Sequence, residues 1–160
     1  YMGTINPQDG VDHLLRAIHA LVRQHGLDGI CCEIIGDGDS LEEVKGLAEQ
    51  LGILENVRFE GWLTCDRWIP LLSSVDVCVE PAPANPLNNS STFIKIMEYM
   101  ALAKPVVCYD LAESRESARD AALYVPPNDT DAMAAARTNT PAGETIQRYP
   151  SKAGRKTAAM

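Results

Sequence analysis

The residues best suited to chemistry lie in a polar loop and at the start of the helix predicted after it. Ser90, Ser91 and Thr92 are small and polar, and they precede an apolar-periodic segment that predicts a helix over 92–102. The first amides of a helix are unpaired, so this arrangement binds anions, and the hydroxyls can donate to a phosphate. Glu98 lies about two helical turns beyond Ser90, where its carboxylate could accept two ribose hydroxyls. A capped surface helix with Glu98 in solvent is the alternative, and both interpretations stay open.

A second glycine-rich turn offers a different nucleotide site. Gly36-Asp37-Gly38 follows an apolar run and precedes a helical pattern, as in the fingerprint that binds nicotinamide dinucleotides. The sixth position of that fingerprint requires Gly or Ala, and this chain has Leu41 there. Glu60, at the end of the next predicted strand, would be the acid that binds the ribose. We therefore keep an NAD-binding domain as a weaker alternative.

Alternating strands and helices must position these loops. Apolar runs predict strands over 30–35, 57–60, 76–80, 105–109 and 121–125, and amphipathic periodicity predicts helices over 10–26, 41–51 and 66–74. Ser40 with Glu43 predicts a capping box, and Asp129 predicts the cap of a last helix. Strands that are apolar on both faces indicate a Rossmann-like, three-layer α/β/α domain with a parallel sheet. Ligands of such sheets bind at the carboxyl ends of the strands.

Composition narrows the classes of function. The 160 residues carry a net charge of −8, with 9 Lys+Arg against 21 Asp+Glu in residues 1–136 and 5 against 1 in residues 137–160. The acidic body excludes a nucleic-acid binder, and no apolar run predicts a membrane span. Tyr1-Met2-Gly3 already looks like the end of a strand, so we expect no signal peptide before the fold. The five cysteines have no zinc-site spacing, which predicts free thiols in a reducing cytoplasm.

One segment carries a family resemblance. Residues 94–107, Ile-Lys-Ile-Met-Glu-Tyr-Met-Ala-Leu-Ala-Lys-Pro-Val-Val, resemble group 1 glycosyltransferases, the large retaining class with the GT-B fold of two facing Rossmann-like domains. Segments 3–12, 35–38, 57–62 and 122–129 resemble further motifs of that family, in the same order. The resemblance covers residues 1–136 and implies the C-terminal, donor-binding domain.

The resemblance implies roles for particular residues. Glu98 matches the second Glu of the family's Glu-x7-Glu motif, which holds the ribose hydroxyls of the donor. The loop that lines the base matches Gly61-Trp62-Leu63, and Gly36 and Gly38 belong to the second donor-side loop. The amides around the diphosphate match those of Ser91, Thr92 and Phe93.

Three departures from the family pattern change the charge of this site. The first Glu of Glu-x7-Glu falls at Ser90, and the family's first-loop Arg and Lys fall at Thr4 and Asp9. Lys95, one turn before Glu98, either supplies part of the missing positive charge or pairs with Glu98 on the surface.

These observations predict a nucleotide-sugar-binding domain that needs no metal or cofactor beyond its UDP-sugar or GDP-sugar donor. By resemblance, the sugar moves from the nucleotide diphosphate to an acceptor with retention, as in a hexosyltransferase. The acceptor-binding N-terminal half is absent from the chain, so we expect the isolated domain to be inactive and capable of self-association through exposed apolar surface. A non-catalytic nucleotide-binding module that works with a partner chain is the alternative. Residues 137–160 lack periodicity and predict a disordered basic tail.

Overall fold

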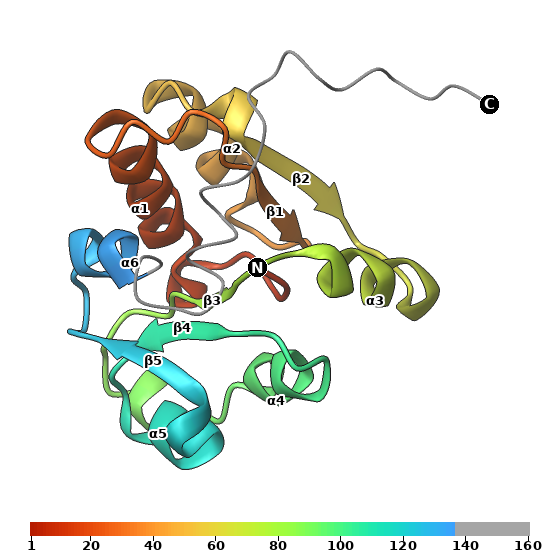
Figure 1. Ribbon diagram of the computed structural model, residues 1–160, viewed down its shortest axis with the longest axis vertical. Coiled ribbons are helices and arrows are strands. Elements are labelled where there is room, and N and C mark those ends of the chain that lie inside the picture. Colours follow the sequence, from red (N-terminus) through yellow and green to blue (C-terminus); the bar gives the residue numbers. More distant parts are fainter. Residues whose placement is uncertain (137–160) are drawn as a thin grey trace.

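The computed structural model describes residues 1–136, and the predicted basic tail lies outside these described residues. Helices and strands alternate along this part of the chain (Figure 1). The helices are α1 (Val11–Arg23), α2 (Leu41–Gln50), α3 (Cys65–Ser74), α4 (Ile94–Ala101), α5 (Ala112–Ala118) and α6 (Thr130–Ala136). The strands are β1 (Cys32–Ile35), β2 (Val57–Gly61), β3 (Cys78–Glu80), β4 (Val106–Tyr109) and β5 (Ala122–Val125).

All strand pairs are parallel, as the sequence predicted. β1 pairs with β2, and β3, β4 and β5 form a second hydrogen-bonded group in that order. The N-terminal residues extend the first group, because Met2 forms a parallel bridge with Ile35 of β1. The prediction that Tyr1–Gly3 ends a strand is therefore confirmed by the pairing of this segment.

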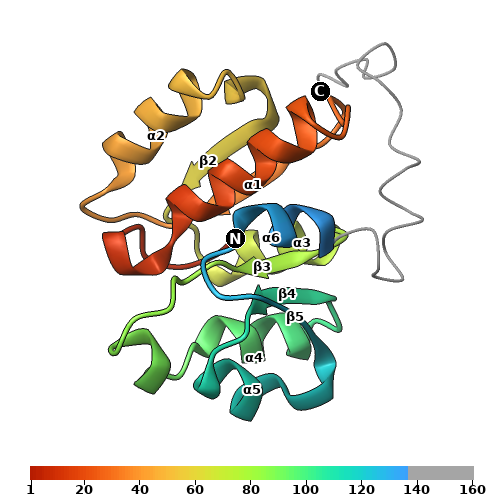
Figure 2. The same ribbon diagram turned by 90° about the vertical axis from the view of Figure 1, so that its left-hand side faces the viewer.

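Helices cover both faces of the strands (Figure 2). α1, α2 and α6 lie on one face, and α3, α4 and α5 lie on the other. The larger core cluster joins Leu14, Leu15 and Ile18 of α1 to β1, β4 and α6. A smaller cluster joins Leu72 of α3 to Tyr99 of α4. The three-layer α/β/α architecture is confirmed.

Several predicted element ends differ from the observed ones. The predicted capping box is not formed, because the Ser40 side chain makes no cap hydrogen bond with α2. The predicted Asp129 cap is confirmed, since an Asp129 carboxylate oxygen accepts the Ala132 amide at 2.8 Å. α4 begins at Ile94 rather than at Thr92, after an extended segment. Within residues 1–136, no helix is long and apolar enough to cross a bilayer.

Candidate functional site

The start of α4 presents free backbone donors at the edge of the sheet. Phe93 is the N-cap residue in an extended conformation, and Ser91 also has extended backbone angles. Among residues 1–136 no group accepts a hydrogen bond from the amides of Thr92 or Phe93. These amides belong to the donors that the N-terminus of a helix offers to an anion.

The hydroxyls before α4 are already engaged. Ser90 and Ser91 donate to loop carbonyls, to Pro86 O at 3.3 Å and to Leu87 O at 2.7 Å. Thr92 Oγ1 donates to Glu113 Oε2 at 2.9 Å, which brings a carboxylate of α5 beside this segment. In this conformation all three hydroxyls donate within the chain, so their donation to a phosphate stays a prediction. An anion would be held here mainly by the backbone.

Glu98 lies about one turn inside α4, because the helix begins at Ile94. Ser90 belongs to a separate 3-10 turn, Asn88–Ser90, so the predicted spacing of about two helical turns between Ser90 and Glu98 is not that of one continuous helix. The Glu98 side chain is half-buried and makes no hydrogen bond or ion pair with residues 1–136. Its carboxylate is available to a ligand.

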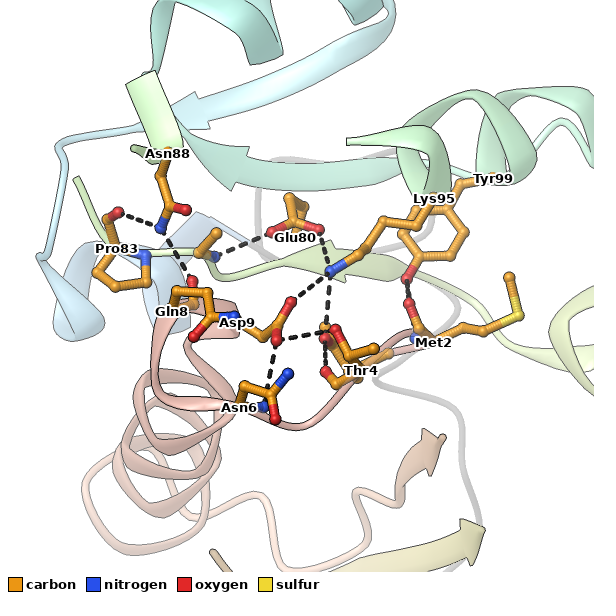
Figure 3. A network of polar contacts seen from close by, with 12 residues as sticks. Met2, Thr4, Asn6, Gln8, Asp9, Glu80, Pro83, Asn88, Lys95 and Tyr99 are labelled. Atoms are coloured by element: carbon orange, nitrogen blue, oxygen red, sulfur yellow. Dashed lines mark hydrogen bonds and ion pairs between the residues drawn. The ribbon is translucent and has the colours of Figure 1, made fainter. Parts of the chain in front are cut away.

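Lys95 occupies the centre of a charged network (Figure 3). Its Nζ lies 3.0 Å from Glu80 Oε2 and 3.7 Å from Asp9 Oδ1, and it donates to Tyr1 Oη at 3.1 Å. The ammonium also lies over the rings of Tyr1 and Phe93, with centroid distances of 4.6 and 5.7 Å. The Lys95 side chain is only 11% exposed. Pairing of Lys95 with Glu98 on the surface is therefore wrong.

The network joins the loop that contains Thr4, Asn6 and Asp9, here called the first loop, to the end of β3. Asp9 Oδ2 accepts from Thr4 Oγ1 at 2.9 Å and from the Asn6 amide at 3.2 Å. Glu80 Oε1 accepts the Ala82 amide at 3.1 Å, whereas its Oε2 meets Lys95 as an ion pair without hydrogen-bond geometry. Burial raises the pKa of Glu80, and Lys95 opposes that rise. One cation thus faces two carboxylates before any ligand arrives.

A buried amide and a buried phenol extend the same connections. Asn88 Nδ2 donates to Gln8 O at 2.9 Å and to Pro83 O at 2.8 Å, which joins the first loop to the loop after β3 (Figure 3). Tyr99 Oη accepts the Met2 amide at 2.9 Å, which joins α4 to the N-terminal segment. The sequence analysis identified none of Glu80, Asn88, Tyr99 or Tyr1 as site residues. An acid at the end of an apolar strand was the available signal for Glu80.

The glycine turn after β1 is closed by the first loop. A Cβ on Gly36 would lie 1.8 Å from Gly3 O, and a Cβ on Gly38 would lie 2.4 Å from Ile5 O. The backbone of Ile5 also bonds to both sides of this turn, to Asp37 O and from the Ser40 amide. Both glycines are needed for contact between two loops of the same chain. These contacts account for Gly36 and Gly38 without a ligand, which removes the support that the two glycines gave to the dinucleotide alternative.

The predicted base-lining loop is accessible. Trp62 is 82% exposed directly after β2, and Gly61 adopts a left-handed conformation with φ +66°. Leu63 instead packs against the smaller core cluster, so its side chain serves the fold. Of the three residues, Trp62 has the surface that stacking on a base would need. In residues 1–136 no group of three or more His, Cys, Asp or Glu side chains is arranged to hold a metal ion.

Comparisons with known proteins agree with this architecture. The sequence model of the family described as "Glycosyl transferases group 1" matches residues 1–139. An uncharacterized glycosyltransferase of Methanocaldococcus jannaschii, MJ1607, is 28% identical over 136 residues, which are 84% of this chain and 33% of that protein. The lipopolysaccharide core biosynthesis glycosyltransferase LpsE of Rhizobium meliloti is 33% identical over 106 residues, 66% of this chain and 27% of that protein.

A solved structure shares the fold. Staphylococcus aureus TarM, crystallised with UDP among its ligands, superposes with a TM-score of 0.74 at 15% identity, over 92% of this chain and 28% of that one. The chain therefore spans about a third or less of the length of the proteins named here.

Proposed function

Because the chain belongs to the group 1 glycosyltransferases, whose model matches residues 1–139, we propose that it is the nucleotide-sugar-binding domain of a retaining hexosyltransferase. One observation carries this proposal. The amides of Thr92 and Phe93 are free, and the Glu98 carboxylate, one turn into α4, has no partner among residues 1–136. The amides take the diphosphate, and Glu98 accepts the ribose hydroxyls. The UDP bound to TarM supports a uridine diphosphate sugar as the donor, and a guanosine diphosphate sugar is the alternative.

The chemistry assigned to this domain is stabilisation of the leaving group. Negative charge develops on the diphosphate as the sugar departs, and fixed backbone dipoles stabilise that charge without reorganising. Lys95 contributes little net positive potential, because Glu80 and Asp9 already neutralise it. The amides and the α4 dipole therefore replace the first-loop cations that this chain lacks. The base stacks on Trp62, whose ring is exposed beside this edge.

Transfer itself requires the acceptor-binding half. We infer that Ile94, Met97 and Met100, which are apolar and exposed on α4, contact that half or a second copy of the chain. The isolated domain then binds nucleotide weakly and transfers no sugar. Sedimentation of the 160-residue chain measures self-association directly, and a monomer at all concentrations would remove the second-copy part of this proposal.

A non-catalytic nucleotide-binding module is the second candidate. The observation that favours it is the charge around the start of α4, where Asp9 and Glu80 both pair with Lys95 and the Glu113 carboxylate accepts from Thr92. This surplus of carboxylates weakens the binding of a diphosphate. A full-length protein that binds donor but never transfers sugar would support this candidate over the first.

Calorimetry with UDP, GDP, ADP and NAD tests the proposed site. We expect UDP or GDP to bind, and Glu98→Ala to weaken binding by about 10- to 100-fold, because hydrogen bonds to a carboxylate contribute roughly 1.5–3 kcal/mol. Glu49→Ala, an exposed glutamate of α2, is the matched control and should bind as the parent does. Binding of NAD alone, or equal affinities in the two variants, would contradict the proposal.

A further inference from the structure

A carboxylate of α5 lies at the segment that carries the free amides before α4. Glu113 Oε2 accepts a hydrogen bond from Thr92 Oγ1 at 2.9 Å, and the other carboxylate oxygen, Oε1, has no hydrogen-bond or ion-pair partner among residues 1–136. The Glu113 side chain is half-buried. One of its oxygens is thus held at the segment whose amides we assign to the diphosphate, and the other remains free to accept a hydrogen bond.

The two acids at the start of α5 differ in their partners. Arg115 Nε donates to Asp110 Oδ1, and Arg115 Nη2 donates to Asp110 Oδ2 at 2.7 Å. Hydrogen bonding to Arg115 lowers the pKa of Asp110, and the guanidinium also lies 4.4 Å from the centroid of the Tyr124 ring. These contacts hold the first turn of α5 in place. Asp110 is therefore neutralised within the chain, whereas Glu113 has no cation beside it among residues 1–136.

Glu113 and Glu98 lie in different directions from the free amides. Glu98 is one turn inside α4, whereas Glu113 meets the chain at Thr92, before that helix begins. Glu113 belongs to the helix that follows β4, and the proposed base-stacking residue Trp62 follows β2, on the other side of β3 (Figure 1). A ligand of a parallel sheet lies across the carboxyl ends of its strands. A nucleotide sugar that runs from β2 past the start of α4 therefore brings its sugar toward β4 and Glu113.

We propose that Glu113 accepts a hydrogen bond from a hydroxyl of the transferred sugar and thereby selects the donor; this inference rests on the proposed nucleotide site. An ionised carboxylate only accepts hydrogen bonds, and a bond of this kind is about twice as strong as one between neutral groups. Toward the diphosphate, the same carboxylate is repulsive. Glu113 therefore favours a nucleotide that carries a sugar over the bare nucleoside diphosphate that remains after transfer.

NMR titration of the 160-residue chain with UDP, UDP-glucose, UDP-galactose and UDP-N-acetylglucosamine tests this inference. GDP, GDP-glucose and GDP-mannose replace them if only GDP binds. We expect at least one nucleotide sugar to bind the parent more tightly than the bare diphosphate does. Glu113→Gln keeps the shape of the side chain and its bond from Thr92, so it should weaken that nucleotide sugar about fivefold and strengthen the bare diphosphate about twofold. Glu113→Ala removes the acceptor and should weaken the nucleotide sugar by at least about 10-fold. The matched control is Glu116→Gln, on the same helix with its side chain 79% exposed, which should bind every ligand as the parent does.

The ratio of the two affinities separates sugar binding from a structural role. If Glu113→Gln changes the affinities for the nucleotide sugar and the bare diphosphate by the same factor, Glu113 does not contact the sugar and the inference is overturned. A parent that binds no nucleotide sugar more tightly than the bare diphosphate, or a Glu116→Gln variant that shifts the ratio equally, overturns it as well. In each of these cases the proposed nucleotide site still stands if Glu98→Ala weakens the bare diphosphate. If neither UDP nor GDP binds the parent, the proposed nucleotide site is wrong and the role of Glu113 is refuted with it.

Discussion

Replacing Lys95 by methionine should destabilise the fold strongly. The substitution keeps an unbranched side chain of similar length and removes the cation that pairs with Glu80 and Asp9, whose side chains are 1% and 11% exposed. Removing one partner of a buried ion pair costs about 3–5 kcal/mol, since a buried charge is left uncompensated. Contacts of the ammonium with Tyr1 and Phe93 are lost as well. We expect a loss of about 3 kcal/mol in the free energy of unfolding at pH 8.

The loss should depend on pH in a defined direction. Burial raises the pKa of Glu80 above its usual value of 4.5, so the folded state disfavours the ionised form. Stability contributed by this group is therefore highest below pH 4.5 and falls as the pH rises through the folded-state pKa. Without Lys95 that pKa rises further. The difference in unfolding free energy between parent and Lys95→Met should consequently be smaller at pH 5 than at pH 8.

Urea unfolding followed by circular dichroism at both pH values measures these differences. Lys45→Met is the matched control, because Lys45 makes an exposed pair with Glu42 and should change stability by less than about 0.5 kcal/mol. Adding Glu80→Gln to Lys95→Met should recover at least about 1 kcal/mol, since the amide removes the unpaired charge. A Lys95→Met variant as stable as Lys45→Met at pH 8 would refute the reasoning.

Three other variants test separate features. Gly36→Ala should destabilise by at least about 2 kcal/mol in thermal unfolding, because its Cβ would overlap Gly3 O, whereas Gly46→Ala in α2 has open space and should stabilise by about 0.5–1 kcal/mol. Asn88→Ala should cost about 1–3 kcal/mol in urea unfolding, since the carbonyls of Gln8 and Pro83 lose the donor that the buried Asn88 supplies, and the exposed Asn89→Ala should cost far less. A thiol reagent at pH 8 should modify the exposed Cys65 in a fast phase, before the buried cysteines. Burial raises the pKa of Cys32 and Cys78 to about 11 and that of Cys108 to about 12. Cys65→Ser should therefore remove the fast phase.

Local patterns predicted the elements because each pattern reflects one neighbourhood of the chain. The apolar positions of α1, from Val11 to Leu21, repeat at helical spacing, and all of their buried members lie in the core. The start of α4 was harder to predict. Thr92 and Phe93 fit a helical pattern, but the Thr92 hydroxyl donates a hydrogen bond to Glu113 of α5, and the chain stays extended until Ile94. That contact joins residues 21 positions apart and leaves no local signal.

The charged network shows the same limit more clearly. Asp9, Glu80 and Lys95 come from the first loop, the end of β3 and α4, and they meet only because parallel strands end at one edge. The sequence analysis noted the missing cations at Thr4 and Asp9, and it considered Lys95 as a source of charge. It did not predict that Lys95 would be enclosed, because burial of a side chain depends on elements far away in the chain.

The contacts of Gly36 and Gly38 with the first loop have a consequence for the kinetics of ligand exchange. A third glycine behaves alike, since a Cβ on Gly10 would lie 2.1 Å from Pro81 O. The loops that follow the N-terminal segment, β1 and β3 thus contact one another through their backbones at these glycines. An outward movement of one loop at these points would break its contact with the next. If a nucleotide binds at this edge, as proposed, its arrival and departure should not require these points of contact to open. Any gate must be supplied by the exposed turn at Trp62 or by the segment that faces this edge in a longer protein.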